Sequence, residues 1–500
     1  MKSKTEQGEA VTRRATNTPN SIATQYKMTT DIPAGIITPD RVETRLGILK
    51  FFDGFPDDAT VQILYDNLDF QRAVQAYLQG LAAIQVRGFR IGLLQWGPAN
   101  RTVVVWEQRM DSHTLFLEAN ANTVYWGIWL DTHGGPLVLE IPPAILGFLN
   151  DAWGRWVVDL GITGPDHGQG GKYLLLPPGY TGEVPDGYFV LRPLTFGVPA
   201  FIRTLLVNDD PQPGIKQCKA HLRSYPLAEA DHPWEMNFVN VSGKPSNYIA
   251  PADASAFDYL NQVIQEEPAE ATDPNMLGLF ATIGIKKGQP FAPNERMQAI
   301  LEEAAAVSNG TARAIVFRFR DPSVYCYPHS AWRPIFTAGG YRFEQDGVRQ
   351  WDSYIPYFFQ GEGVSPAIDV KMVGKGSQYA QAFVDANGEP LDGSKTYRLH
   401  LPGPIPALDF WSVILYDTQT RSMLQTDQQV PMASSQTPGM EVNPDTSVDV
   451  YFSPEPPAGM EYNWVQTIPG KEWFTLLRLY GPLEPWFDKT WRPGEIELLD

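Results

Sequence analysis

Apolar residues between Asp57 and Leu81 recur at intervals of three and four positions. This spacing places them on one face of an α-helix, so it predicts one or two amphipathic helices, which Gly80 should weaken at their end. Residues 1–35, in contrast, are rich in polar side chains and show no hydrophobic period. Such a segment cannot bury enough apolar surface to offset its ordering entropy, so we expect a disordered tail there.

Beyond residue 100 the pattern changes to short runs rich in aromatic and β-branched residues, most of them ended by Gly, Pro or Asp. Runs of this kind predict β-strands. In the first half of the chain they lie at 101–106, 124–130, 136–141, 172–176 and 187–191, and near the C-terminus at 396–401, 410–416, 447–452 and 473–480. Many short strands separated by turns favour β-sandwich or barrel-like units.

The residues between these two strand-rich regions favour helices. Asp253 and Asn294 each precede a run of apolar residues at helical spacing and can cap a helix. The whole pattern therefore predicts a multi-domain, mainly β protein with a helical N-terminal segment and a helical connecting segment. The predicted division is a tail at 1–35, an N-terminal domain at 36–225, a helical or irregular connecting segment at 226–370, and a C-terminal β-sandwich domain at 371–500.

Composition and charge narrow the classes of partner. Lysine and arginine number 39 against 57 aspartates and glutamates, a net charge of −18, so the surface should repel a nucleic-acid backbone. The longest apolar stretches are broken by charges and prolines, so no membrane span is expected. Because the first residues lack the apolar core of a signal peptide, we expect a cytoplasmic protein, or a secreted or periplasmic one if a signal peptide has been removed. Self-association into a homo-oligomer stays open.

Metal and cofactor signals are weak. Cys218 and Cys326 match no zinc or redox spacing, although one disulfide between them stays open. The seven histidines form no pair at metal-binding spacing, so no metal and no organic cofactor is expected. The one metal hypothesis is that Asp111 and His113 share a strand face and converge with Asp131.

No Gly-x-Ser-x-Gly motif is present, so a serine hydrolase of that type is not predicted.

Several motifs resemble two families of unknown function. Asn120-Ala-Asn-Thr-Val-Tyr125, Trp129-Leu-Asp131 and the run Gly170–Gly179 resemble domain of unknown function 1254, over roughly residues 45–225. Leu391-Asp-Gly-Ser-Lys-Thr-Tyr397 and Arg478-Leu-Tyr480 are similar to domain of unknown function 1214. The resemblance implies a mostly β, multi-domain architecture and brings no agreed reaction.

Two positions depart from these families. Asn122 stands where the first family usually has an aspartate, which argues against an acid or metal-ligand role at that position. Thr446 stands where the second commonly has glycine in an Asp-Gly-Ser turn, so we expect a locally altered turn.

Aromatic, amide and charged side chains concentrate in a few segments, and such mixtures stack on and hydrogen-bond polar organic ligands. The candidate substrate-binding residues are Asn120, Asn122, Trp126, Trp153, Trp411, Arg421, Asn463 and Trp464. Core packing is the alternative role for any one of the tryptophans. Asn120 and Asn122 either share a strand face or cap a turn through Asx hydrogen bonds. Arg478 interrupts an apolar strand, which indicates either a structural salt bridge or an anion clamp at a domain interface.

The leading functional hypothesis is a cofactor-independent enzyme that acts on a small polar organic or sugar-like substrate by acid–base chemistry at an interdomain cleft. The candidate catalytic residues are Asp111 or Asp131 for proton transfer, Tyr125 as an acid or orienting hydroxyl, and Arg155 as a charge stabiliser. One alternative is a non-catalytic protein that binds a carbohydrate or aromatic ligand. Another is a structural β protein that self-associates.

Overall fold

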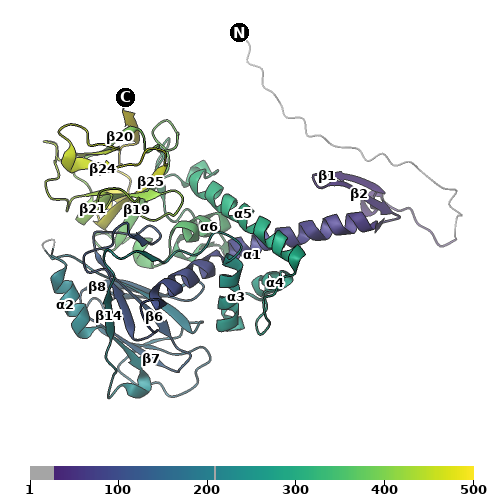
Figure 1. The fold of residues 1–500 in the computed structure, drawn as a ribbon, viewed down its shortest axis with the longest axis horizontal. Coiled ribbons are helices and arrows are strands. Elements are labelled where there is room, and N and C mark those ends of the chain that lie inside the picture. The colour runs from purple at the N-terminus through teal and green to yellow at the C-terminus, as the bar shows by residue number, and fades with distance from the viewer. Residues whose placement is uncertain (1–26, 208–209, 500) are drawn as a thin grey trace, which may run out of the picture. The chain divides into compact units, whose positions relative to one another are not determined.

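The computed structural model describes residues 27–207 and 210–499, in two compact units that divide between Gln71 and Arg72 (Figure 1). Of the predicted tail 1–35, residues 1–26 lie outside the described part of the chain. The rest of that tail leads into a short 3-10 turn at Ala34–Ile36.

The first unit contains an antiparallel meander of β1 (Arg41–Thr44), β2 (Gly47–Phe52) and β3 (Phe55–Pro56). Helix α1 (Asp58–Leu94) begins in this unit, where the Asp57 carboxylate accepts a hydrogen bond of 2.8 Å from the Thr60 backbone N–H. The helix runs past Gly80 and the predicted end at Leu81. Gly80 does not end the helix. It lets Leu260 pack closely against the helix, because a Cβ at this position would lie 3.0 Å from the methyl carbons of Leu260.

The second unit begins with two packed sheets that we call the N-terminal sandwich. The larger sheet has the order β14-β4-β6-β12-β8-β9 and the smaller β11-β10-β7-β13. Side chains such as Ile128 and Leu139 from the two sheets join one hydrophobic core, which α2 (Gln212–His221) covers with Ile215 and Cys218. The strands of the N-terminal sandwich are β4 (Thr102–Val105), β6 (Val124–Asp131), β7 (Leu137–Ile141), β8 (Ile145–Asn150), β9 (Trp156–Gly161), β10 (Gly171–Leu175), β11 (Phe189–Leu191), β12 (Gly197–Thr204), β13 (Arg223–Pro226) and β14 (Asn237–Asn240).

Two further sheets form the C-terminal sandwich, with orders β16-β19-β25-β21-β22 and β24-β23-β20-β26. Leu399 and Val450 from one sheet pack with Val413 and Leu477 from the other. The strands are β16 (Arg333–Pro334), β19 (Ser377–Ala382), β20 (Thr396–Leu401), β21 (Ala407–Asp417), β22 (Met432–Ser434), β23 (Val448–Ser453), β24 (Trp464–Gln466), β25 (Trp473–Pro482) and β26 (Ile496–Leu499). In Figure 1 the N-terminal and C-terminal sandwiches lie next to each other within the second unit.

The chain between β14 and β19 contains the helices α3 (Ala256–Glu266), α4 (Pro274–Thr282), α5 (Glu295–Phe317) and α6 (Trp351–Gln360). Asn294 caps α5 as predicted, because its side chain accepts a hydrogen bond of 2.9 Å from the Met297 N–H. Helix α6 was not predicted. Its residues from Ser353 to Gln360 are all buried, and Pro356 lies inside the helix, where a proline normally argues against a helical segment.

Minor elements complete the chain. They are the strand pairs β5 (Thr114–Leu115) with β15 (Ser246–Asn247) and β17 (Glu344–Gln345) with β18 (Val348–Arg349), the short helix α7 (Glu484–Phe487), and single 3-10 turns such as Pro366–Ile368.

The structure confirms the predicted class of a mainly β, multi-domain protein with helical segments. Cys218 and Cys326 are both free thiols, so the disulfide left open by the sequence is absent. Within 27–207 and 210–499, no helix has the length and apolar character that crossing a membrane requires.

Thr446 lies in the turn that was expected to be locally altered. It adopts a left-handed φ of +68°, and the carboxylate of Asp445 accepts a 3.1 Å hydrogen bond from the Ser447 N–H. A β-branched residue rarely adopts this conformation, because its Cβ crowds the following carbonyl. The turn is therefore strained at Thr446.

Replacing the strained residue should stabilise the protein. We expect Thr446→Gly to raise the free energy of unfolding by about 1 kcal/mol, because glycine adopts a left-handed φ without steric cost. Urea unfolding followed by circular dichroism measures the change. Thr181→Gly is the control at an exposed threonine without positive φ, and it should leave stability unchanged or lower it. An equal effect of both substitutions would contradict strain at Thr446.

Candidate functional site

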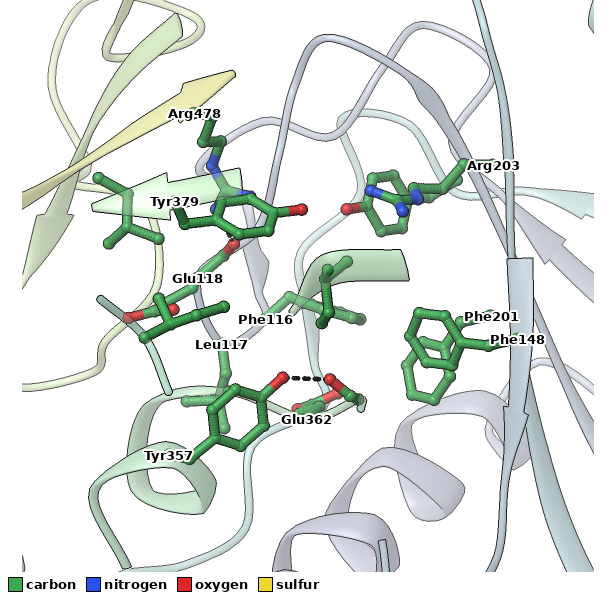
Figure 2. Close-up of a pocket in the computed structure, with 16 residues that line it drawn as sticks. Phe116, Leu117, Glu118, Phe148, Phe201, Arg203, Tyr357, Glu362, Tyr379 and Arg478 are labelled. Carbon is green, nitrogen blue, oxygen red and sulfur yellow. Dashed lines mark hydrogen bonds between the residues drawn. The ribbon is translucent and has the colours of Figure 1, made fainter. Parts of the chain in front are cut away.

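A buried pocket lies where the two sandwiches meet the segment that follows α6 (Figure 2). Its internal volume is about 90 Å³. Figure 2 shows Arg203, Tyr379 and Arg478 along the upper side, Tyr357 and Glu362 on the lower side, and Phe148 with Phe201 together at the right. The pocket therefore combines a cationic side, an acidic side and an aromatic side.

Strand register places the polar side chains. In the N-terminal sandwich β12 pairs antiparallel with β6, which sets Arg203 directly opposite Tyr125. In the C-terminal sandwich β19 pairs antiparallel with β25, which sets Tyr379 opposite Arg478. Directly opposed residues point to the same face of a sheet. Each sandwich thus contributes one arginine–tyrosine pair to the pocket.

The two arginines are buried, with exposed fractions of 8% for Arg203 and 4% for Arg478. Arg478 was expected to form either a structural salt bridge or an anion clamp, and in the part of the chain that the structure describes it forms no ion pair. It donates instead to the Tyr416 hydroxyl at 2.7 Å and to the Glu118 backbone carbonyl. Arg203 donates to the Tyr480 hydroxyl at 3.2 Å and likewise has no ion pair among these residues. Neutral oxygens, not carboxylates, hold both guanidinium groups.

Two glutamates face this cationic side. Burial raises the pKa of Glu118 to about 8, although the guanidinium groups of Arg478 and Arg333 act in the opposite direction. Burial also raises the pKa of Glu362 well above its ordinary value, and no charged group offsets the effect. Oε1 of Glu118 and both carboxyl oxygens of Glu362 are buried without a hydrogen-bond partner among the described residues. Burial therefore favours the protonated, neutral form of both carboxyl groups.

Tyr379 has the opposite shift. Burial alone would raise the pKa of its phenol, but the positive charges of Arg203 and Arg478, together with hydrogen bonds from Ser377 and Arg203, lower it below the ordinary value. Its hydroxyl lies 2.6 Å from the Ser377 Oγ. The pocket thus holds an acid that retains its proton and a phenol that loses its proton more easily than usual. Pairs with opposed shifts of this kind are typical of acid–base sites.

Close packing of the backbone at Gly363 holds the acidic side of the pocket, with Tyr357 and Glu362, in position. The Tyr357 hydroxyl donates to the Gly363 carbonyl, and a Cβ on Gly363 would lie 2.5 Å from the ring of Phe148. Only glycine fits there, so the chain at Glu362 lies directly against the aromatic side. Phe148 in turn stacks on Phe201 at 5.1 Å between ring centroids.

Two family profiles match this chain. Residues 100–226 match Protein of unknown function (DUF1254), and residues 376–484 match Protein of unknown function (DUF1214). The chain contains both domains, in that order. Glu118, Tyr125 and Arg203 come from the DUF1254 domain, Tyr379 and Arg478 from the DUF1214 domain, and Tyr357 and Glu362 from residues outside both matches.

One solved structure shows a similar fold, and a second match is weaker. The VPA0106 protein from Vibrio parahaemolyticus is 17% identical, and its alignment covers 86% of this chain and 100% of that chain with a TM-score of 0.54. An uncharacterized protein from Burkholderia cenocepacia is 12% identical, with 87% of this chain and 96% of that chain covered at a TM-score of 0.38. No curated protein shows significant sequence similarity to the chain.

The family motif around Asn120 joins the DUF1254 and DUF1214 domains. The amide of Asn120 donates to the Tyr480 hydroxyl at 2.5 Å, and that of Asn122 donates to Ser434 Oγ at 3.0 Å and Gln436 Oε1 at 2.9 Å. The Asn122 N–H also donates to the Asn120 side chain at 3.0 Å, which is an Asx turn rather than an extended strand. Both residues are fully buried, and neither lines the pocket.

Besides Arg478, Tyr125 is the one residue singled out by the sequence that lines this pocket. Asp111 and Asp131 each accept from the backbone N–H of the histidine two positions later, at 3.0 and 2.9 Å, and are not pocket residues. Five other candidates line neither this pocket nor the second one described below. They pack in the domain cores or form hydrogen bonds with backbone groups: Trp126, Trp411, Arg421, Asn463 and Trp464. Asp111, His113 and Asp131 do not form a metal cluster, since no group of three or more such ligands occurs among the described residues.

Trp153 and Arg155 line the second, larger pocket of about 480 Å³ on the other side of α6. Arg155 forms an ion pair with Asp151 at 2.6 Å, and Trp153 is buried and stacks on Phe280. Aromatic side chains and three arginines dominate the lining: Trp153, Trp156, Tyr341, Phe343, Trp351, Tyr354 and Phe358, with Arg155, Arg342 and Arg349. Helix α6 separates the pockets, since Tyr357 faces one and Phe358 the other.

Sequence reasoning missed Glu118, Arg203, Tyr357, Glu362 and Tyr379. Arg203 carried the same signal as Arg478, because it interrupts an otherwise apolar strand, GVPAFIRT. Glu118 and Glu362 lie in loops, where a carboxylate is ordinary and gives no signal of burial. Their role depends on packing between segments far apart in the chain.

The pKa of Glu118 makes a prediction about pH and stability. The native carboxyl keeps its proton up to about pH 8, whereas the unfolded one loses it near its ordinary value of 4.5. Between these values the native state binds more protons, so this group lowers the free energy of unfolding as pH rises. The melting temperature of Glu118→Gln should therefore rise relative to wild type as pH increases from about 5 to about 8.

Differential scanning fluorimetry across this pH range checks the prediction. The matched control is Glu303→Gln, at an exposed glutamate of α5, which should show a constant difference from wild type. A difference for Glu118→Gln that stays constant with pH would show that the carboxyl is ionised in the native protein at neutral pH.

Proposed function

We propose that the protein is an enzyme that acts on a small polar organic molecule by acid–base chemistry in the pocket between the DUF1254 and DUF1214 domains. The observation that carries the proposal is the opposed tuning of Glu118 and Tyr379 beside two buried arginines. A protonated carboxyl and an acidic phenol in one pocket can give and take protons on the same substrate.

Each group has a role in this proposal. Glu118, whose pKa is raised to about 8, is the general acid, and Tyr379, whose pKa Arg203 and Arg478 lower, is the general base. The two guanidinium groups stabilise negative charge that develops on the substrate. Tyr125 orients the substrate from the strand position opposite Arg203. Glu118 thus takes the proton-transfer role that the sequence suggested for Asp111 or Asp131.

The size of the pocket supports a small substrate. A volume of about 90 Å³ is below the roughly 150 Å³ of a cavity that holds benzene, so the reacting part has about six non-hydrogen atoms or fewer. This favours a small organic acid, amide or alcohol over a complete sugar ring.

The test is turnover of a panel of small hydroxy acids, keto acids, their amides and short polyols. Proton NMR in deuterated water detects both product formation and hydrogen–deuterium exchange at carbon. We expect at least one compound to react, and Glu118→Gln and Tyr379→Phe each to lower its rate by about a hundredfold or more. The rate should also fall as pH rises through about 8, where Glu118 loses its proton.

Matched substitutions outside the pocket separate a catalytic effect from a general one. Glu303→Gln and Tyr462→Phe change exposed side chains of the same types and should keep the wild-type rate. Equal rates in Glu118→Gln, Tyr379→Phe and wild type would refute the proposed roles.

The second pocket favours a second candidate function, the binding of an aromatic or carbohydrate ligand. Its volume of about 480 Å³ is in the range of small-molecule sites, and its aromatic walls can stack on a planar ring or a sugar face. Isothermal titration calorimetry with indole and with methyl glucoside tests this function. Trp351→Ala should weaken binding by about tenfold, and Tyr462→Ala should not change it. Absence of binding by either ligand would remove the support for this candidate.

A further inference from the structure

We infer that the ligand of the buried pocket is a small monocarboxylate, with its carboxylate group between Arg203 and Arg478 and its organic part against Phe148 and Phe201. This inference rests on the proposed function for the location of the site, and it adds the chemical class of the substrate.

The charge of the pocket points to an anion. Arg203 and Arg478 are buried and form no ion pair with any residue that the structure describes, and Arg333 is buried close behind Glu118. Ionised Tyr379 would offset only one of these buried positive charges, and a buried cation without an anionic partner is costly, because it has lost its hydration without a compensating charge. A bound anion would supply that charge at the point where the two domains meet.

Partnerless polar atoms support the same conclusion. Nε of Arg478, Oε1 of Glu118 and both carboxyl oxygens of Glu362 belong to residues that line the pocket, and none has a hydrogen-bond partner among the described residues. Buried polar atoms normally find partners, so a cluster of unsatisfied ones in one pocket indicates a site completed by a ligand. A carboxylate can accept from Arg478 and from the protonated carboxyl of Glu118, whose pKa responds to the nearby Arg478.

The remaining walls distinguish a carboxylate from inorganic phosphate or sulfate. Phe116, Phe148, Phe201 and Leu476 line the pocket and offer no hydrogen bonds. A phosphate or sulfate ion presents oxygen in every direction, so an apolar wall would leave some of these oxygens desolvated and unpaired. A monocarboxylate has one charged end and one apolar or weakly polar end, which matches the two sides of the pocket.

Calorimetric titration of the wild-type protein tests the inference with acetate, propionate and lactate, each against its neutral amide. We expect each carboxylate to bind at least about tenfold more tightly than its amide, and more tightly than inorganic phosphate. Because this comparison needs no variant, it does not depend on how a buried arginine tolerates substitution. Amides that bind as tightly as the acids, or phosphate that binds more tightly, would overturn the inference.

Variants then locate the site. Arg203→Lys keeps the charge but loses the planar fork, and it should weaken carboxylate binding by about tenfold, while Arg203→Gln should abolish it. Arg320→Gln, at a side chain that is 87% exposed, is the control and should bind as wild type does. Unchanged binding in a folded Arg203→Gln variant would also overturn the inference.

The two proposals fail separately. Carboxylate binding that depends on Arg203, with no turnover of any bound compound, supports this inference and refutes the acid–base function. Turnover of a neutral compound that depends on Glu118, with no carboxylate binding, supports the acid–base function and overturns this inference.

Discussion

The burial of residues 116–122 between the two sandwiches is the constraint on which the pocket depends. Buried backbone and amide groups need hydrogen-bond partners, and the C-terminal sandwich supplies them. The Tyr416 hydroxyl donates to the Ala119 carbonyl at 2.6 Å, and Asn122 donates to Ser434. Arg478 donates to the Glu118 carbonyl. The contacts that dock the domains therefore also set Glu118 in the pocket, so interface and site cannot form independently.

The positive charge of the pocket depends on the partners of its two arginines, which are neutral oxygens rather than carboxylates. Tyr480 accepts from both Asn120 and Arg203, and Tyr416 accepts from Arg478, so the arginines are bonded without being neutralised. In a medium of low polarity their charge acts strongly on nearby groups. Burial keeps the proton on Glu118, while the arginines favour the ionised form of Tyr379. Burial thus raises the pKa of Glu118, and the two arginines lower that of Tyr379.

Local pattern was sufficient for the cap of α5 and for the strands that were predicted, each of which overlaps an observed strand, but it missed others such as β8 and β12. The predicted strand 396–401 has the same bounds as β20, and 124–130 differs from β6 by one residue. The failures are tertiary in origin. Helix α1 continues through Gly80, where Leu260 packs closely, and α6 forms in spite of Pro356 in a segment that is buried from Ser353 to Gln360. Asn120 and Asn122 were correctly singled out as unusual amides, but their partners lie more than three hundred positions away in the chain.

The sequence by itself determined the mainly β, multi-domain class, because alternation and turn residues act over a few neighbouring positions. It also marked Arg478 as a buried charge in need of an explanation, since a charge within an apolar strand is costly wherever the strand packs. Only the tertiary structure decided which groups face that charge. Arg203, Glu118, Glu362 and Tyr379 come from four separate segments, and their pKa shifts arise from burial and charge across the domain interface, which no local pattern encodes.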